Sequence, residues 1–233
     1  MLLYDENMDN KMLQKKRIMQ YFIDSAEYII DKEGIDNITI RKVASLAGYN
    51  SATLYNYFEN LDHLIFVVGL NHLENYHNAL PNYIKDCENS LEFYMEVCRC
   101  FFEFSYAEPE LYMKLFFRNL EKKYEKYAQE YYDLFPEKGM SQSSDLSSFL
   151  RKNNLYDRSL TMLKKCVSDG ILTHEGAGEF NEIAMLICYG QLMYVIHNFK
   201  NAETATEESM KYYKKIISSY INPEFKHLLD NIR

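Results

Sequence analysis

Residues 38–58 decide the fold of this chain, and they read ITIRKVASLAGYNSATLYNYF. Thr39 is a good N-cap, and the apolar stripe after it predicts a short helix that Gly48 ends. Asn50 can cap a second short helix, on which Leu54 faces inward. Two short helices joined by a tight turn form a helix-turn-helix, whose second helix is suited to read the major groove of DNA.

The outward face of the second helix is small and polar, which permits close approach to base edges. It carries Ser51, Ala52, Thr53 and Asn56. Thr and Ala can contact a thymine methyl group, and Asn can form two hydrogen bonds with adenine. Tyrosine hydroxyls at either end of the helix can bond phosphates. On spacing alone, a corner of two helices with a glycine turn and no role in DNA binding also fits.

The same stretch resembles the tetracycline-repressor (TetR) family of transcriptional regulators. The shared pattern is a Thr-capped helix, an Ala-Gly turn at 47–48, the runs Thr-Leu-Tyr at 53–55 and Tyr-Phe at 57–58, and a cap at Asn60. The resemblance covers only the N-terminal part of the chain. It implies that Thr39, Arg41, Tyr49 and Tyr55 contact the DNA backbone, and that Asn50, Ala52, Thr53 and Asn56 face bases or neighbouring phosphates.

Charge predicts a small positive patch on this part rather than a basic face. The whole chain carries a formal net charge of −8. Basic residues gather at 15–17 and 41–42, and Arg17 lies where a helix start disfavours cations, which suits either phosphate contact or a solvated cluster. Leu61 stands where the family often has a lysine that holds a phosphate.

The remaining chain predicts an all-α protein, because 233 residues contain only 8 Gly and 4 Pro. We expect a three-helix DNA-binding domain over 1–62 and a larger helical effector-binding and dimerisation domain over 63–233, with about nine helices in all. Loops are expected at 133–144 and 174–178. The expected helices of the chain beyond the helix-turn-helix lie near 15–33, 61–84, 88–106, 109–132, 146–169, 179–199 and 204–220.

The second domain is rich in aromatic residues. Most of them must be core, although aromatic side chains with polar tips can also line an apolar pocket. The family resemblance implies a small-molecule effector site here, and we expect a hydrophobic or aromatic ligand. The candidate pocket residues are Tyr94, Phe101, Phe104, Tyr112 and Phe116.

The run 183–196 has no charged residue but falls short of the roughly 20 residues that span a bilayer, so we expect a buried helix. Such a helix either lies in the core of a monomer, or packs one face on its own core and the other on a partner subunit. The resemblance implies a homodimer through the last two long helices, which suits a palindromic operator. The candidate interface residues are Met185, Tyr189, Leu192, Met193, Ile196, Tyr213 and Ile217.

The sequence offers little support for an enzyme. The chain has no P-loop, no nucleophile elbow and no H-E-x-x-H, so we expect no catalytic residue, metal or cofactor. Its 5 cysteines lack a C-x-x-C pair, and with no apolar signal segment they predict reduced thiols in a cytoplasmic protein. The main hypothesis is a repressor that an effector releases from DNA. A helical receptor of the same fold that does not bind DNA, and a helical enzyme, are the alternatives.

Overall fold

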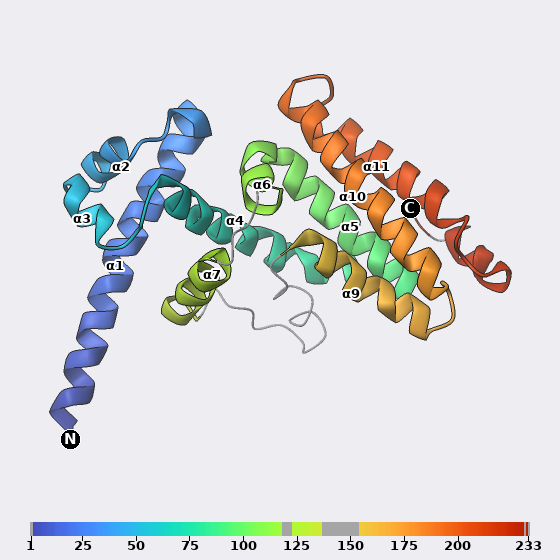
Figure 1. Ribbon diagram of the computed structural model, residues 1–233, viewed down its shortest axis with the longest axis horizontal. Helices are drawn as coiled ribbons and strands as arrows, with labels where there is room; N and C mark the ends of the chain where they lie inside the picture. The colour runs from blue at the N-terminus through green and yellow to red at the C-terminus, as the bar shows by residue number, and fades with distance from the viewer. Residues whose placement is uncertain (1, 118–122, 137–153, 231, 233) are drawn as a thin grey trace. The chain divides into compact units, whose positions relative to one another are not determined.

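The computed structural model describes residues 2–117, 123–136, 154–230 and 232, and these residues are helical apart from loops and one isolated antiparallel bridge (Figure 1). The predicted all-α class is confirmed. Two short 3-10 segments lie at Ile35–Asn37 and Pro223–Asp230. The α-helices are α1 (Leu2–Glu33), α2 (Ile40–Leu46), α3 (Ser51–Tyr55), α4 (Leu61–Ile84), α5 (Ser90–Ala107), α6 (Pro109–Phe116), α7 (Lys123–Leu134), α9 (Leu155–Ser168), α10 (His174–Ile196) and α11 (Ala202–Ile217).

The described residues form ten α-helices rather than about nine, because the single helix expected over 109–132 is two helices. Helix α6 ends at Phe116 and α7 begins at Lys123, and the two pack in different parts of the molecule. No glycine or proline marks this break, so local sequence gave no signal for it. The expected loop over 133–144 lies outside the described residues beyond 136, as does the expected helix before 154.

The stretch 174–178 is the first turn of α10, so the expectation of a loop there is wrong. The Thr173 hydroxyl accepts a hydrogen bond from the Gly176 N–H at 3.0 Å and caps the helix. A Cβ added at Gly176 would lie 2.9 Å from the Thr173 hydroxyl oxygen and 3.1 Å from Tyr220 side-chain atoms. Glycine therefore serves close packing at this position rather than a turn.

Packing divides the chain into two units, and the division falls within α4 after Glu74. Unit 1 contains α1, α2, α3, the first part of α4, and α7. Unit 2 contains the rest of α4 with α5, α6, α9, α10 and α11. The expected boundary between two domains, after residue 62, stays a prediction.

The core of unit 1 forms where α1 meets the helix-turn-helix. Phe22 of α1 is fully buried, and its ring centroid lies 6.2 Å from that of Phe58 in an edge-to-face contact. Leu54 of α3 and Val43 of α2 are also fully buried. These side chains fix α2 and α3 on α1, so the polar face of α3 is turned away from the core.

The core of unit 2 is built around α5 and is rich in buried tyrosines. The hydroxyls of Tyr94 and Tyr106 bond the hydroxyls of Ser159 and Ser209 at 3.0 and 2.8 Å. Tyr213 donates to the Ala184 carbonyl oxygen at 2.8 Å. These three hydroxyls are therefore satisfied inside the protein, as buried polar groups require.

The five cysteines are free thiols, and all but Cys87 are buried, which confirms their predicted packing role. Within the described part of the chain, no helix combines the length and apolar character needed to cross a membrane. The uncharged run 183–196 lies within α10, and this helix packs against α5, α6, α9 and α11.

Candidate DNA interface and ligand cavity

Three features set α2 and the turn after it: a side-chain cap, a glycine with positive φ, and a backbone hydrogen bond from the turn back to α2. The Thr39 hydroxyl accepts from the Lys42 N–H at 3.2 Å and starts α2. Gly48 adopts a φ of 78°, a region that glycine occupies without steric cost. The Tyr49 N–H then bonds the Ala44 carbonyl oxygen at 2.8 Å, which closes the end of α2.

Helix α3 is shorter than expected, because it ends at Tyr55 rather than near Phe58. The Asn50 side-chain oxygen accepts from the Thr53 N–H at 2.8 Å and from the Thr53 hydroxyl at 3.1 Å. Phe58 still points inward, because its N–H bonds the Leu54 carbonyl oxygen at 3.0 Å. Since the Thr53 hydroxyl is used in the cap, its methyl group is the part left to meet a base.

The predicted DNA contacts are exposed or half-buried residues of α1 and the helix-turn-helix. Three of them, Ala52, Tyr55 and Asn56, are exposed on α3 or at its end, and Tyr55 is 55 % exposed. Of the others, Thr39, Arg41 and Asn50 are exposed in α2 or at the caps, Arg17 is exposed on α1, and Tyr49, Ser51 and Thr53 are half-buried.

The basic clusters are partly engaged within unit 1. The Lys42 ammonium lies 2.6 Å from the Glu33 carboxylate and bonds the Asn37 carbonyl oxygen at 3.0 Å. Lys16 lies over the Phe135 ring, 5.3 Å from its centroid. Of the two basic residues of α2, Lys42 is held by this ion pair and Arg41 is exposed, so the positive patch is narrower than the sequence suggested.

Helix α7 contributes residues that sequence reasoning placed in the second domain. Tyr127 donates to the Glu59 carboxylate at 2.5 Å, and its ring stacks on His63 with centroids 3.7 Å apart. The His63 Nδ1 accepts from the Glu59 N–H at 3.1 Å, and burial lowers the pKa of His63 to about 4. No local pattern reveals this contact, because Glu59 and Tyr127 lie far apart in the chain.

A second polar contact ties α7 to α4 and α1. The Tyr131 hydroxyl donates to the Asn71 side-chain oxygen at 3.2 Å. The Asn71 amide donates in turn to the Glu27 carboxylate at 2.5 Å. This chain of bonds holds three helices of unit 1 in one arrangement.

Comparison with known proteins finds a family similarity in the N-terminal part of the chain. Residues 22–68 match the family model described as bacterial regulatory proteins, tetR family. This part of the chain is similar to TetR-family regulatory proteins. The match covers the end of α1, the helix-turn-helix and the start of α4, and it agrees with the resemblance found in the sequence. A search among curated proteins gives no match.

Solved structures share the fold of this chain at low sequence identity. A putative TetR-family regulator from Syntrophomonas wolfei has a TM-score of 0.56 and 14 % identity, over 87 % of this chain and 95 % of its own. FadR from Thermus thermophilus, in complex with lauroyl-CoA, has a TM-score of 0.53 and 14 % identity, over 84 % and 92 %. RolR in complex with resorcinol has a TM-score of 0.53 and 12 % identity, over 94 % of each chain.

Unit 2 contains an apolar cavity of about 30 Å³. Predicted pocket residues Tyr94 and Phe101 line it. Phe104, Tyr112 and Phe116 lie behind this wall. The Tyr112 and Phe116 rings pack on Phe101 at 5.7 and 5.5 Å, and Phe104 packs at 6.1 Å on Tyr76, which also lines the cavity. Sequence reasoning missed α9, which supplies Leu155, Arg158, Ser159 and Met162.

The predicted interface residues divide between core and surface. Leu192, Tyr213 and Ile217 are at most 2 % exposed, so the structure places them in the protomer's own core. Met185 lines the cavity, and Tyr189, Met193 and Ile196 are exposed or half-buried on α10. Periodicity could not separate these groups, because α10 is apolar around its circumference. The predicted interface residues also omit Leu186 and Phe199, which are 71 % and 74 % exposed.

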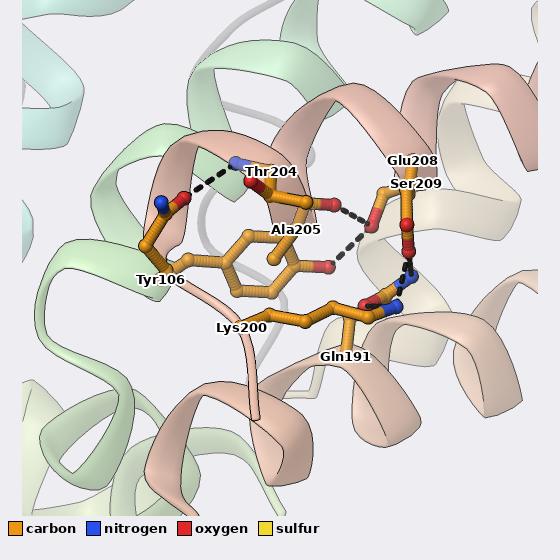
Figure 2. Close-up of polar contacts among 8 residues, drawn as sticks. Tyr106, Gln191, Lys200, Thr204, Ala205, Glu208 and Ser209 are labelled. Atoms are coloured by element: carbon orange, nitrogen blue, oxygen red, sulfur yellow. Dashed lines mark hydrogen bonds and ion pairs between the residues drawn. The ribbon is translucent and has the colours of Figure 1, made fainter. Parts of the chain in front are cut away.

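A polar cluster fixes the junction between α10 and α11 (Figure 2). Lys200 bonds the Glu208 carboxylate and the Gln191 side-chain oxygen, and Lys200 also lies over the Tyr194 ring. The hydrogen bond from Lys200 holds the pKa of Glu208 below its ordinary value. Asn201 then caps α11 by accepting from the Thr204 N–H at 2.8 Å. These bonds hold the exposed turn between the two helices in place.

Proposed function

We propose that this protein is a TetR-family DNA-binding regulator, that it acts as a homodimeric repressor of a palindromic operator, and that a small hydrophobic or aromatic effector releases it from DNA. The observation that carries the proposal is the capped α3, with its small, polar and exposed outer face, inside the region that matches the family. Small side chains permit the backbone of α3 to approach base edges in the major groove.

The reading of bases rests on few groups. The methyl groups of Ala52 and Thr53 suit contact with thymine methyls, and the Asn56 amide suits two hydrogen bonds with adenine. Ser51 and Asn50 at the start of α3 face bases or the adjoining phosphates. Backbone contacts fix the register without reading sequence. They come from the hydroxyls of Tyr49, Tyr55 and Thr39 and the guanidinium groups of Arg17 and Arg41.

The surface of α10 supports a homodimer. Leu186, Tyr189 and Met193 recur at spacings of three and four residues and lie on one side of the helix. Leu186 and Tyr189 are exposed, Met193 is half-buried, and none of them carries a charge. An apolar helix face of this kind suits burial against an identical face across a two-fold axis. Two α3 helices related by that axis match two half-sites of a palindrome.

The cavity of unit 2 supports a small-molecule effector. Its walls are mostly aromatic, aliphatic and sulfur-containing side chains from five helices, together with Arg158 and Ser159 of α9. Pockets of this composition bind apolar ligands. FadR from Thermus thermophilus with lauroyl-CoA and RolR with resorcinol are two proteins of the same fold that bind small molecules. A difference in effector affinity of about 1–3 kcal/mol between DNA-bound and free protein is enough for regulation.

Two α3 variants and one control test the DNA contacts. Fluorescence anisotropy would measure binding to the DNA upstream of the chain's own gene and to single-base variants of the bound site. Tyr55→Phe removes one phosphate contact and should weaken all sequences alike, by about fivefold. Asn56→Ala should change base preference at one position, by about 1–3 kcal/mol. Tyr28→Phe is the matched control, because Tyr28 is also 55 % exposed but lies on α1.

The variants separate the proposed roles from general damage. If Asn56→Ala weakened all sequences equally, or if Tyr28→Phe weakened binding as much as Tyr55→Phe, the assignment of contacts would be wrong. The slope of affinity against salt gives a further check, at roughly 0.9 per neutralised phosphate. Binding that barely responds to salt would contradict the phosphate contacts.

A further inference from the structure

Helix α7 is part of the unit that carries α3, although its neighbours in the chain belong to unit 2. The helix before it, α6, and the next described helix after it, α9, both lie in unit 2. Within unit 1, Tyr127 and Tyr131 of α7 are only 2 % and 1 % exposed. Helix α7 therefore supplies buried side chains to the unit whose α3 is proposed to bind DNA.

Tyr127 contacts the segment that joins α3 to α4. Its hydroxyl donates to the Glu59 carboxylate at 2.5 Å, and its ring stacks on the His63 ring with 3.7 Å between the centroids. The Glu59 N–H donates in turn to the His63 Nδ1 at 3.1 Å. Burial lowers the pKa of His63 to about 4, so this nitrogen can accept at neutral pH. Tyr127, Glu59 and His63 thus form one closed set of contacts at the start of α4.

The same set of contacts continues into α3. The His63 ring meets the Phe58 ring edge to face, with 5.4 Å between the centroids. The Phe58 N–H bonds the carbonyl oxygen of Leu54, the buried residue of α3, at 3.0 Å. Helix α3 has only five residues, so its direction depends on the residues that hold its end more than on its own length. A side chain that fixes the junction of α3 and α4 therefore also fixes the direction of α3.

We infer that Tyr127 is a positioning residue for DNA recognition, because it holds Glu59 and His63 at the junction that sets the direction of α3. This inference rests on the proposed DNA-binding function. The bond from the phenol to a carboxylate is charge-assisted and belongs to the stronger hydrogen bonds of proteins. Side chains that meet base edges must be held to within about 0.5 Å by supporting residues. Tyr127 acts through the junction rather than on the DNA, because its side chain is buried.

The first test compares two tyrosines of α7 in the full chain. Tyr127→Phe keeps the ring on His63 and removes the bond to Glu59. It should weaken binding to the upstream site by about fivefold or more and lower the preference for that site over unrelated DNA. Tyr131→Phe is the matched control, because it removes a buried hydroxyl from the same helix, where the bond goes to Asn71 instead. The control should keep its affinity within about twofold.

A double-mutant cycle shows whether Tyr127 acts through Glu59. Glu59→Ala removes the acceptor of the hydrogen bond, and its lost charge is common to both members of the comparison made in that background. There the effect of Tyr127→Phe on DNA affinity should shrink from about fivefold to less than about twofold, because the interaction is already absent. A merely structural role of the tyrosine would give the same loss in both backgrounds.

Amide hydrogen exchange of the free protein supplies a measurement without DNA. Tyr127→Phe and Glu59→Ala should each speed exchange over residues 57–64 by about threefold or more, and Tyr131→Phe should not. Glu59 is exposed, so its variant also covers the case in which Tyr127→Phe does not fold.

The outcomes separate this inference from the proposed function. Wild-type protein that binds the upstream DNA supports the proposed function. An unchanged affinity in Tyr127→Phe, an equal loss in Tyr131→Phe, or a loss that persists in the Glu59→Ala background would then overturn the inference alone. Faster exchange at the junction without weaker DNA binding would overturn it too. A folded wild-type protein that binds no DNA would overturn both.

Discussion

Protonation of His63 should weaken unit 1 at mildly acidic pH. The neutral ring stacks on Tyr127, meets the edge of Phe58 at 5.4 Å, and accepts the Glu59 N–H through Nδ1. A proton on Nδ1 removes that acceptor and places a charge in a site that is only 5 % exposed. Burial accordingly lowers the pKa of His63 from 6.5 to about 4.

The size of the effect follows from this lowered pKa. Between the two pKa values the unfolded chain binds a proton that the folded chain does not, so stability is complete above about pH 6.5 and falls as the pH drops toward 4. Linkage over this window gives a loss of about 2 kcal/mol between pH 7 and pH 5 from His63 alone. The loss should not grow further once the pH is below the folded pKa.

Urea unfolding at pH 7 and pH 5 would measure the loss. His63→Phe keeps an aromatic ring between Tyr127 and Phe58 but has no titratable group, so its pH 7 to pH 5 loss should be smaller than that of the wild type by about 2 kcal/mol. His174→Gln is the control, because His174 is exposed on α10. An equal loss in His63→Phe and wild type would refute the reasoning.

Three further predictions concern stability and are measured by thermal or urea unfolding. Gly176→Ala should destabilise the protein by about 1–3 kcal/mol through overpacking on Tyr220, whereas Gly178→Ala, with open space around its Cβ, should be neutral or stabilising by up to about 1 kcal/mol; the reverse order would contradict the packing at α10. Gly48→Ala places a side chain at a φ of 78° in open space, so it should cost about 1–2 kcal/mol from the backbone alone, and no loss would be inconsistent with this turn. Tyr213→Phe removes the buried bond to the Ala184 carbonyl oxygen and should cost about 1 kcal/mol; an unchanged stability would show that the bond contributes nothing.

Local sequence patterns predicted the helix-turn-helix well, because caps and turns are decided by neighbouring residues. Thr39, Gly48 and Asn50 occupy the positions expected of an N-cap, a turn glycine and a second N-cap. The expectation was wrong at the end of α3, because the inward-facing Phe58 lies beyond the last helical residue, Tyr55. One hydrogen bond from the Phe58 N–H keeps that direction after the regular helix has ended.

Long-range packing explains what the sequence did not reveal. Tyr127 was assigned to the second domain by its place in the chain, yet it contacts Glu59 and His63 in unit 1. Arg158 was not recognised as part of the cavity, because a charged residue on an amphipathic helix is usually solvated. On α10, burial of Leu192 and exposure of Leu186 depend on which neighbours cover each side, and hydrophobicity alone is the same for both.

Footprinting of the upstream DNA tests the central claim most directly. Purified, folded protein would be added to DNA from the region before its own gene, and its oligomeric state would be measured in the same buffer. The account predicts one protected palindromic site with half-sites about one helical turn apart, bound by a dimer and lost in the Asn56→Ala variant. A folded protein that protects no upstream fragment, or that protects a single site without symmetry as a monomer, would contradict the account.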